Sequence, residues 1–394
     1  RTGFEMRGDE LIQVIYEERT PDYEYVEHDE RSDEEIMESF VAPFDLKSGS
    51  LVRIKLVKRQ GYMLLLLDMH HIITDGVSIG LFFKELARAY NGEEDAFEIR
   101  QYKDYSEWML TRDLSKERAY WIEQFKEHVP ALKLPTDYKR PAVQRFQGAL
   151  VRWKIADQLN EKVQKLCGQN GFTEYMVYLG SLMVLLSRYG REEEIAVGSP
   201  ISARSHEDME HMLGMFVNTL VMRAFPKAEK PVMDFLQEVK KVCLEAYENQ
   251  EYPFEELIEQ IDVVRDFTRN PLFDVSLAVQ NFEEQVLSLE GITCKTFDRE
   301  TTVSKFDLSF NVCTKLGEHY LEIEYDTDLY QEETIHWMGQ HFLEVVQKVV
   351  DEPEQLIGRI EMTTEKEKQF IDQFNDTGKA YDKNKTVVHI WEEQ

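Results

Sequence analysis

The sequence is short of positive charge. Its 394 residues include 46 Lys and Arg against 75 Asp and Glu, so the formal net charge is -29. Nucleic acids and anionic membranes are bound by clustered Lys and Arg that neutralise phosphates. The composition therefore argues against nucleic acid and membrane as partners.

Cysteine and long apolar runs are also scarce. The longest apolar run, around residues 62–67, is far shorter than the ~20 residues that span a bilayer. The few cysteines are widely scattered without a CxxC pair, which predicts reduced thiols and no metal site. They are Cys167, Cys243, Cys294 and Cys313. We expect a soluble, cytoplasmic protein.

The length and the hydrophobic content of 42% predict two sizeable cores. Strands and helices alternate on both sides of a stretch rich in proline and charge, "LKLPTDYKRPAVQRFQG" at 132–148, which predicts two α/β lobes. We place the N-terminal lobe at 1–140, the C-terminal lobe at 141–358 and a linker at 359–394. Predicted strands are 11–17, 51–59, 62–70, 149–155, 194–202, 272–282, 305–316 and 319–330, and predicted helices are 76–91, 102–128, two within 157–190, 231–250 and 332–351.

One motif carries chemistry: "MHHIITDGVS" at 69–78. A lone histidine is more often a hydrogen-bonded core or surface residue than a catalyst. Here, however, a buried strand ends at His70 and His71, and a tight turn follows at Asp75 that Gly76 permits. An imidazole with a pKa near neutrality can accept a proton from an attacking amine, hydroxyl or thiol. Asp75 either pairs with an Arg or orients the ring. Neighbouring histidines on a strand point to opposite faces, which argues against a metal.

The motif resembles the HHxxxDG signature of the condensation domains of nonribosomal peptide synthetases, in the chloramphenicol-acetyltransferase-like superfamily. Further segments resemble that family's signatures in the same order along the chain. They are "RTGF" at 1–4, "YKDYSEWM" at 102–109, "LGMFVNTLVMR" at 213–223, "NQEYPFEEL" at 249–257 and "RDFTRNPLFDV" at 265–275. Since "RTGF" resembles only the end of a family motif, we expect residues upstream of Arg1. The segment "FNDTGKAYDKNKTVVHIWEEQ" at 374–394 is similar to one that leads into an adenylation domain.

The resemblance implies two lobes arranged as a V around a central tunnel, and it implies a role for each motif residue. His71 matches the catalytic position, as a general base or as a group that positions the amine. His70 and Asp75 match structural positions, and Asp75 is expected to pair with Arg1 or with an upstream Arg. Gly76 would keep the tunnel open to a thioester arm.

Other residues have weaker implied roles. Asn218 and Ser309 are possible tunnel residues, with a strand-end amide and an ordinary strand hydroxyl as the alternatives. Arg269 and Asn270 are expected to hold a loop. The aromatic cluster Tyr102, Tyr105 and Trp108 is expected to be core packing.

The implied activity is amide-bond formation by an acyltransferase. An upstream carrier protein would supply an acyl thioester, and a downstream carrier the amine of an aminoacyl thioester. Both ride on phosphopantetheine arms, so the domain needs no cofactor of its own, and an adenylation domain is the expected neighbour. Two alternatives remain: an epimerization domain, and a catalytically silent docking domain. A heterocyclization domain would carry DxxxxD in place of HHxxxDG.

Overall fold

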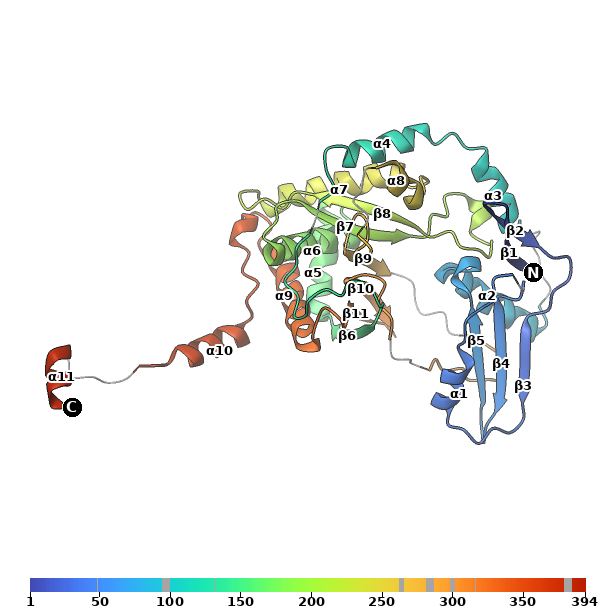
Figure 1. The fold of residues 1–394 in the computed structure, drawn as a ribbon, viewed down its shortest axis with the longest axis horizontal. Coiled ribbons are helices and arrows are strands. Elements are labelled where there is room, and N and C mark those ends of the chain that lie inside the picture. The colour runs from blue at the N-terminus through green and yellow to red at the C-terminus, as the bar shows by residue number, and fades with distance from the viewer. Residues whose placement is uncertain are drawn as a thin grey trace.

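The computed structural model describes residues 1–47, 49–93, 100–130, 132–261, 266–280, 287–297, 302–315, 317–378 and 385–394. Within these residues the strands form three sheets, and two of the sheets lie apart in Figure 1 with helices running between them. Arg265, the first residue of one family motif, lies outside the described residues. No described helix is long and apolar enough to cross a membrane.

The N-terminal part holds a β-hairpin, a three-stranded sheet and four helices. Its elements are β1 (Thr2–Arg7), β2 (Glu10–Ile15), β3 (Asp22–Val26), α1 (Asp33–Phe40), β4 (Val52–Lys58), β5 (Met63–Met69), α2 (Gly76–Asn91), α3 (Tyr102–Leu110) and α4 (Ser115–Phe125). The sheet order is β3-β4-β5, with β3 parallel to β4 and β5 antiparallel to it. One face of this sheet packs on α1, where Ile36 meets Val57, Leu64 and Leu66. The sequence did not predict β1, β3 or α1, because these segments are short and carry weak periodicity.

The C-terminal part is built on one mixed sheet with the order β6-β11-β10-β9-β7-β8. Its elements are β6 (Gly148–Lys154), α5 (Asp157–Asn170), α6 (Glu174–Gly190), β7 (Ile195–Ile201), β8 (Asn218–Ala224), α7 (Val232–Glu248), α8 (Phe254–Gln260), β9 (Val275–Gln280), β10 (Leu308–Lys315), β11 (Glu318–Asp326) and α9 (Glu332–Asp351). Strand β9 runs parallel to both β7 and β10. The predicted mixture of helices and strands is confirmed.

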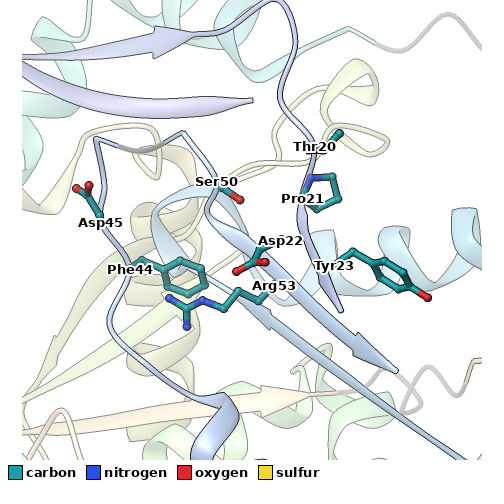
Figure 2. A pocket seen from close by; sticks show the side chains of 8 residues that line it. All are labelled: Thr20, Pro21, Asp22, Tyr23, Phe44, Asp45, Ser50 and Arg53. Carbon is teal, nitrogen blue, oxygen red and sulfur yellow. The ribbon is translucent and has the colours of Figure 1, made fainter. Parts of the chain in front are cut away.

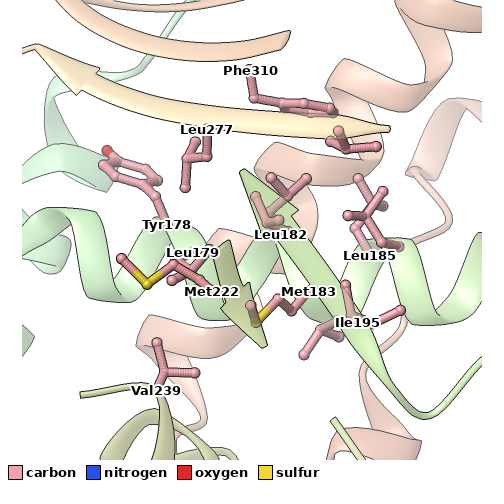
Figure 3. Close-up of a cluster of buried hydrophobic side chains, with 14 of the residues drawn as sticks. Tyr178, Leu179, Leu182, Met183, Leu185, Ile195, Met222, Val239, Leu277 and Phe310 are labelled. Carbon is pink, nitrogen blue, oxygen red and sulfur yellow. The ribbon is translucent and has the colours of Figure 1, made fainter. Parts of the chain in front are cut away.

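Helix α6 is the centre of the larger core. Every residue from Met176 to Leu186 is buried, so this helix is covered on all sides. Figure 3 shows its side chains between the sheet, represented by Leu277 and Phe310, and Val239 of α7. Gly180 allows the close approach of α7, because a Cβ there would lie 2.7 Å from a methyl carbon of Leu236. A helix this apolar is stable only when such neighbours surround it.

The packing differs from the predicted boundaries in two places. The helical pattern over 102–128 is broken into α3 and α4, and α4 packs on the C-terminal core through Trp121 and Phe125. The indole of Trp121 donates to the Asn249 carbonyl (2.8 Å). Helix α4 therefore belongs to the C-terminal core although it precedes residue 140. The predicted boundary at residue 140 lies just before the chain enters the larger sheet. At the other end Ile360, beyond the predicted limit of 358, is buried in the same core.

The C-terminal segment leaves this body. Helices α10 (Glu365–Asn375) and α11 (Val387–Glu393) extend away from both sheets in Figure 1. A short network anchors the first turn of α10: Tyr189 donates to His341 Nδ1 (2.6 Å), and His341 Nε2 donates to Glu367 (2.8 Å).

A buried ionic cluster lies where β9 and β10 begin. Arg269 donates to Asp274 (2.7 Å), and Arg140 donates to Asp307 (2.8 Å). The second oxygen of Asp274 is buried without a hydrogen-bond partner among the described residues. Burial and the neighbouring Asp307 carboxylate raise the pKa of Asp274 to about 6. Because folding raises this pKa, the contribution of Asp274 to stability is complete at low pH and is lost as the pH rises through about 6.

The Asp274→Asn variant tests this cluster. We expect the melting temperature of the variant to rise relative to that of the parent as the pH increases from about 4 to about 6.5. The reason is that only the parent must ionise a buried carboxyl over this range. Thermal unfolding across this range, with the exposed Asp137→Asn as control, measures it. A constant difference across the range would contradict the assignment.

Candidate functional site

The histidine motif lies between a strand and a helix. Strand β5 ends at Met69, His71 begins a single 3-10 turn, and α2 starts at Gly76. Both histidines are therefore past the strand, and the expected alternation of their side chains across a sheet does not apply. Their directions are set by the turn instead.

The ring of His71 is held by one backbone contact. Its Nδ1 lies 2.6 Å from the Thr74 carbonyl oxygen. A carbonyl only accepts, so Nδ1 carries the hydrogen and Nε2 keeps its lone pair. His71 is exposed, and its Nε2 has no protein partner among the described residues. The arrangement offers a proton acceptor of fixed tautomer at the surface of the turn.

His70 has a supporting role in this structure. Its Nδ1 accepts from the Ile72 amide (3.0 Å), which fixes the 3-10 turn, and its ring lies edge-on to Phe44 at 5.8 Å. Phe44 in turn stacks on the Arg53 guanidinium, 3.7 Å from the ring centre. These two residues line an open pocket on the N-terminal lobe (Figure 2). Arg53 donates to the Ala42 and Pro43 carbonyls and to the Asp68 carboxylate. Arg53 is thereby held in place under Phe44, and Phe44 supports the His70 ring.

Asp75 joins the motif to the C-terminal lobe. Its carboxylate accepts from the Ser78 amide (2.7 Å), capping α2, and from the Phe216 amide (3.2 Å). Arg204 Nη2 donates to both of its oxygens, at 3.0 and 3.1 Å. The side chains of Asp75 and Arg204 are 1% and 5% exposed, so the pair is withdrawn from water.

The partner of Asp75 was predicted wrongly. Arg1 donates to the carbonyl of Glu17 instead, and the ion pair is made by Arg204, 129 positions away from Asp75. Arg204 follows strand β7 in "ISARSHE" and has no special spacing in the sequence. Only the contact between the lobes identifies it.

Further contacts complete this junction, which we call the Asp75 latch and define as Asp75, Ser78, Arg204 and the backbone of 214–216. The Ser78 hydroxyl donates to the Gly214 carbonyl (2.9 Å) and accepts from the Gly214 amide (3.0 Å). Tyr102 donates to the Met215 carbonyl (2.9 Å). The cluster Tyr102, Tyr105 and Trp108 packs against Met209, Met212 and Phe216. Its predicted role as core packing is confirmed.

Gly76 differs from its predicted conformational role. Its φ is not positive, and it is the first residue of α2, so the turn does not require glycine. A Cβ placed there would meet no atom within 4 Å. The space beside Gly76 is open, as it is beside several other glycines of the described residues.

Asn218 is fully engaged inside the C-terminal lobe. Its Nδ2 donates to the Gln250 and Tyr252 carbonyls (2.8 Å each), and its Oδ1 accepts from the Thr219 and Phe254 amides. These contacts match the alternative in which the amide completes a strand end.

Ser309, by contrast, is on β10 in register with Ser276 of β9, on the sheet face opposite the buried Leu308 and Phe310. The sheet face that carries the two serines is the polar one, so Ser309 stays a candidate for substrate contact.

Arg269 and Asn270 hold their loop as expected, through Leu132, Asp274 and the Lys305 carbonyl.

Replacement of Arg204 tests the latch. We expect Arg204→Ala to lower the free energy of unfolding by about 3–5 kcal/mol, because it leaves the Asp75 carboxylate buried and unpaired. Chemical denaturation measures the loss, and Arg1→Ala is the control with little expected effect. Equal losses in the two variants would contradict the assignment of Arg204.

Comparison with known proteins shows the family. The family model described as "Condensation domain" matches residues 1–371. Gramicidin S synthase 2 of Aneurinibacillus migulanus is 41% identical over 401 residues, covering 100% of this chain and 9% of that protein. Bacitracin synthase 3 of Bacillus licheniformis is 38% identical over 400 residues, covering 100% of this chain and 6% of that protein. The chain thus spans less than a tenth of the length of these curated relatives.

Solved structures share the fold. A four-domain nonribosomal peptide synthetase bound to AMP and glycine matches with a TM-score of 0.81 at 20% identity, over 93% of this chain and 30% of that one. The X-domain from teicoplanin biosynthesis, in complex with OxyB, matches with a TM-score of 0.82 at 21% identity, over 93% of this chain and 84% of that one. These likenesses confirm the predicted chloramphenicol-acetyltransferase-like fold. The chain belongs to the condensation-domain family of nonribosomal peptide synthetases.

Proposed function

We propose that this domain forms an amide bond between two carrier-bound substrates. The amine of an aminoacyl thioester on the downstream carrier attacks the acyl thioester on the upstream carrier. A C–N bond forms, the C–S bond breaks, and the lengthened chain is left on the downstream carrier. Both thioesters are held by phosphopantetheine arms, and an adenylation domain following the linker would load the acceptor.

The observation that supports this reaction most directly is the state of the His71 ring. Nε2 is exposed with a free lone pair, while Nδ1–H is bonded to the Thr74 carbonyl. Nε2 accepts the proton that the attacking nitrogen must lose and returns it to the departing thiolate. The Thr74 carbonyl keeps the ring aligned. Thioesters are already activated, so positioning of the two arms supplies much of the remaining rate.

His71→Ala tests this role. With a loaded donor carrier and a loaded acceptor carrier, we expect the rate of transfer to fall by about 10²–10⁴-fold if proton transfer limits it. Mass spectrometry of the acceptor carrier follows the product, and chiral analysis of both aminoacyl groups detects epimerization. His28→Ala, an exposed histidine far from the motif in sequence, is the matched control.

The outcomes separate the candidate functions. Transfer in the parent and loss in the variant support a condensation catalyst with His71 in the reaction, while transfer in both keeps the function but reduces His71 to a positioning residue. Inversion of a stereocentre without transfer would indicate an epimerization domain. Neither activity with several substrate pairs would favour a silent docking domain.

The open space at Gly76 gives a second test. If the thioester arm passes beside it, Gly76→Trp should lower the transfer rate by about tenfold or more, a loss of at least ~1.4 kcal/mol in transition-state stabilisation. Gly76→Ala should keep its rate, because a Cβ meets no neighbour. Both variants should keep the parent's melting temperature. A Trp variant with the parent's rate would place the arm elsewhere.

A further inference from the structure

The segment between α7 and α8 points a carboxylate toward the loop that carries Arg204. Glu251 lies in this segment, and its side chain is 20% exposed. Its Oε1 accepts from the Ser205 hydroxyl (2.8 Å), and its Oε2 accepts from Arg112, which follows α3. We call the contact of Glu251 with Ser205 and Arg112 the Glu251 bridge. One carboxylate thus joins three segments that are distant in the sequence, and the reaction proposed above gives it no role.

The backbone of Glu251 is held on both sides. Asn218 Nδ2 donates to the Gln250 carbonyl and to the Tyr252 carbonyl, at 2.8 Å each. Asn218 is the first residue of β8 and pairs with Ile201 at the end of β7. A side chain carried by so fixed a backbone can hold other groups in place. Asn218 therefore places the Glu251 carboxylate beside the loop that follows β7.

The loop that contains Ser205 is strained. Ala203 has a φ of 42°, in the left-handed region that L side chains rarely adopt. Such a conformation persists where surrounding contacts enforce it. Arg204 directly follows Ala203 and binds Asp75, and the next residue, Ser205, binds Glu251. The Glu251 bridge therefore supplies one of the contacts that keep the loop in this conformation.

The Arg112 side of the bridge supports a second donor to Asp75. The Arg112 guanidinium lies over the Trp108 ring, 4.7 Å from its centre. Trp108 belongs to the aromatic cluster that packs against Phe216. The Phe216 amide donates to Asp75 (3.2 Å), and the Phe216 ring lies 4.1 Å from the Arg204 guanidinium. Both sides of the bridge thus lead to groups that hold the Asp75 carboxylate.

The position of Asp75 bears directly on His71. The carbonyl that accepts from His71 Nδ1 belongs to Thr74, and it lies in the peptide group that joins Thr74 to Asp75. A peptide group is planar, so the direction of this carbonyl depends on where the backbone of Asp75 is held. Looser contacts at Asp75 would let the carbonyl turn and the His71 ring exchange between its tautomers.

We propose that Glu251 is a positioning residue for the transfer reaction. It holds the Arg204 loop and the end of α3 in place around Asp75. The Thr74 carbonyl then keeps the His71 ring with its hydrogen on Nδ1 and its lone pair on Nε2. The proposal rests on the function given above, because that function assigns the acceptance of a proton to Nε2.

The kinetics of Glu251→Ala and Ser205→Ala test the proposal. We expect kcat of Glu251→Ala to fall about tenfold, within the range for substitutions that act through a chain of contacts. Ser205→Ala removes one hydroxyl and should lower kcat less, and the double variant should lower it no further than Glu251→Ala. KM for either loaded carrier should stay that of the parent, because neither residue touches substrate in this role.

The matched control is Asp208→Ala, in the same loop. Its carboxylate pairs with Arg100 at 3.3 Å, and the two side chains are 42% and 67% exposed. This pair also joins the loop to the segment before α3, but it has no contact with the groups that hold Asp75. Asp208→Ala should therefore keep the parent's kcat.

The His71 ring is observed separately by NMR of protein labelled with 15N-histidine, at alkaline pH, where imidazoles are neutral. The nitrogen shifts report which ring nitrogen carries the hydrogen, and the signals missing from His71→Ala identify the residue. We expect a single tautomer with hydrogen on Nδ1 in the parent and in Asp208→Ala. In Glu251→Ala we expect a mixture of both tautomers. This measurement needs neither a carrier nor activity.

The two measurements together decide the proposal. Mixed tautomers with a lower kcat support it. A single tautomer in both Glu251→Ala and Ser205→Ala overturns it whatever happens to kcat, and mixed tautomers with the parent's kcat also overturn it. If Glu251→Ala does not fold, Ser205→Ala serves for both measurements. If the parent transfers nothing between any pair of carriers, the tautomers alone decide whether Glu251 positions the ring, and only the proposed reaction is contradicted.

Discussion

The buried pair of Asp75 and Arg204 is the contact on which the arrangement of the site depends. Asp75 caps the helix that follows the histidine turn, and Arg204 belongs to the other lobe. One carboxylate thus fixes a local helix start and a long-range junction together. The cost of burying two charges is offset by their other hydrogen bonds: Asp75 accepts from the Phe216 amide, and Arg204 donates to the Ser78 hydroxyl. His71 is placed four residues before this capped position, and its ring is held within the same turn by the Thr74 carbonyl.

Local chemistry made the motif predictable from sequence. A buried strand, two histidines and an Asp-Gly before an amphipathic helix indicate a strand–turn–helix unit, and the structure has one. The large C-terminal elements were predictable as well, because long apolar helices such as α6 and strands such as β10 have strong periodicity. The short elements β3 and α1 lacked that signal.

Most of the other missed features are tertiary. No spacing rule links Asp75 to Arg204. The sequence of α4 also does not show that Trp121 packs in the C-terminal core, because α4 precedes the C-terminal lobe in the chain. Asn218 could be weighed only as a candidate, since three of its four partners come from a distant segment brought to it by folding. The glycine of the motif was expected for its backbone freedom, yet its φ is ordinary and the space beside it is open.

The Asp75 latch also has a mechanical meaning. Because Gly214 and Phe216 bond to the first turn of α2 and its cap, the lobes cannot separate at this point without breaking these hydrogen bonds and the buried ion pair of Asp75 and Arg204. Any widening that admits or releases a bulky chain must therefore pivot about the latch, with the greatest displacement at parts of the lobes far from it. The histidine turn, at the pivot, keeps its place while the rest of the molecule opens.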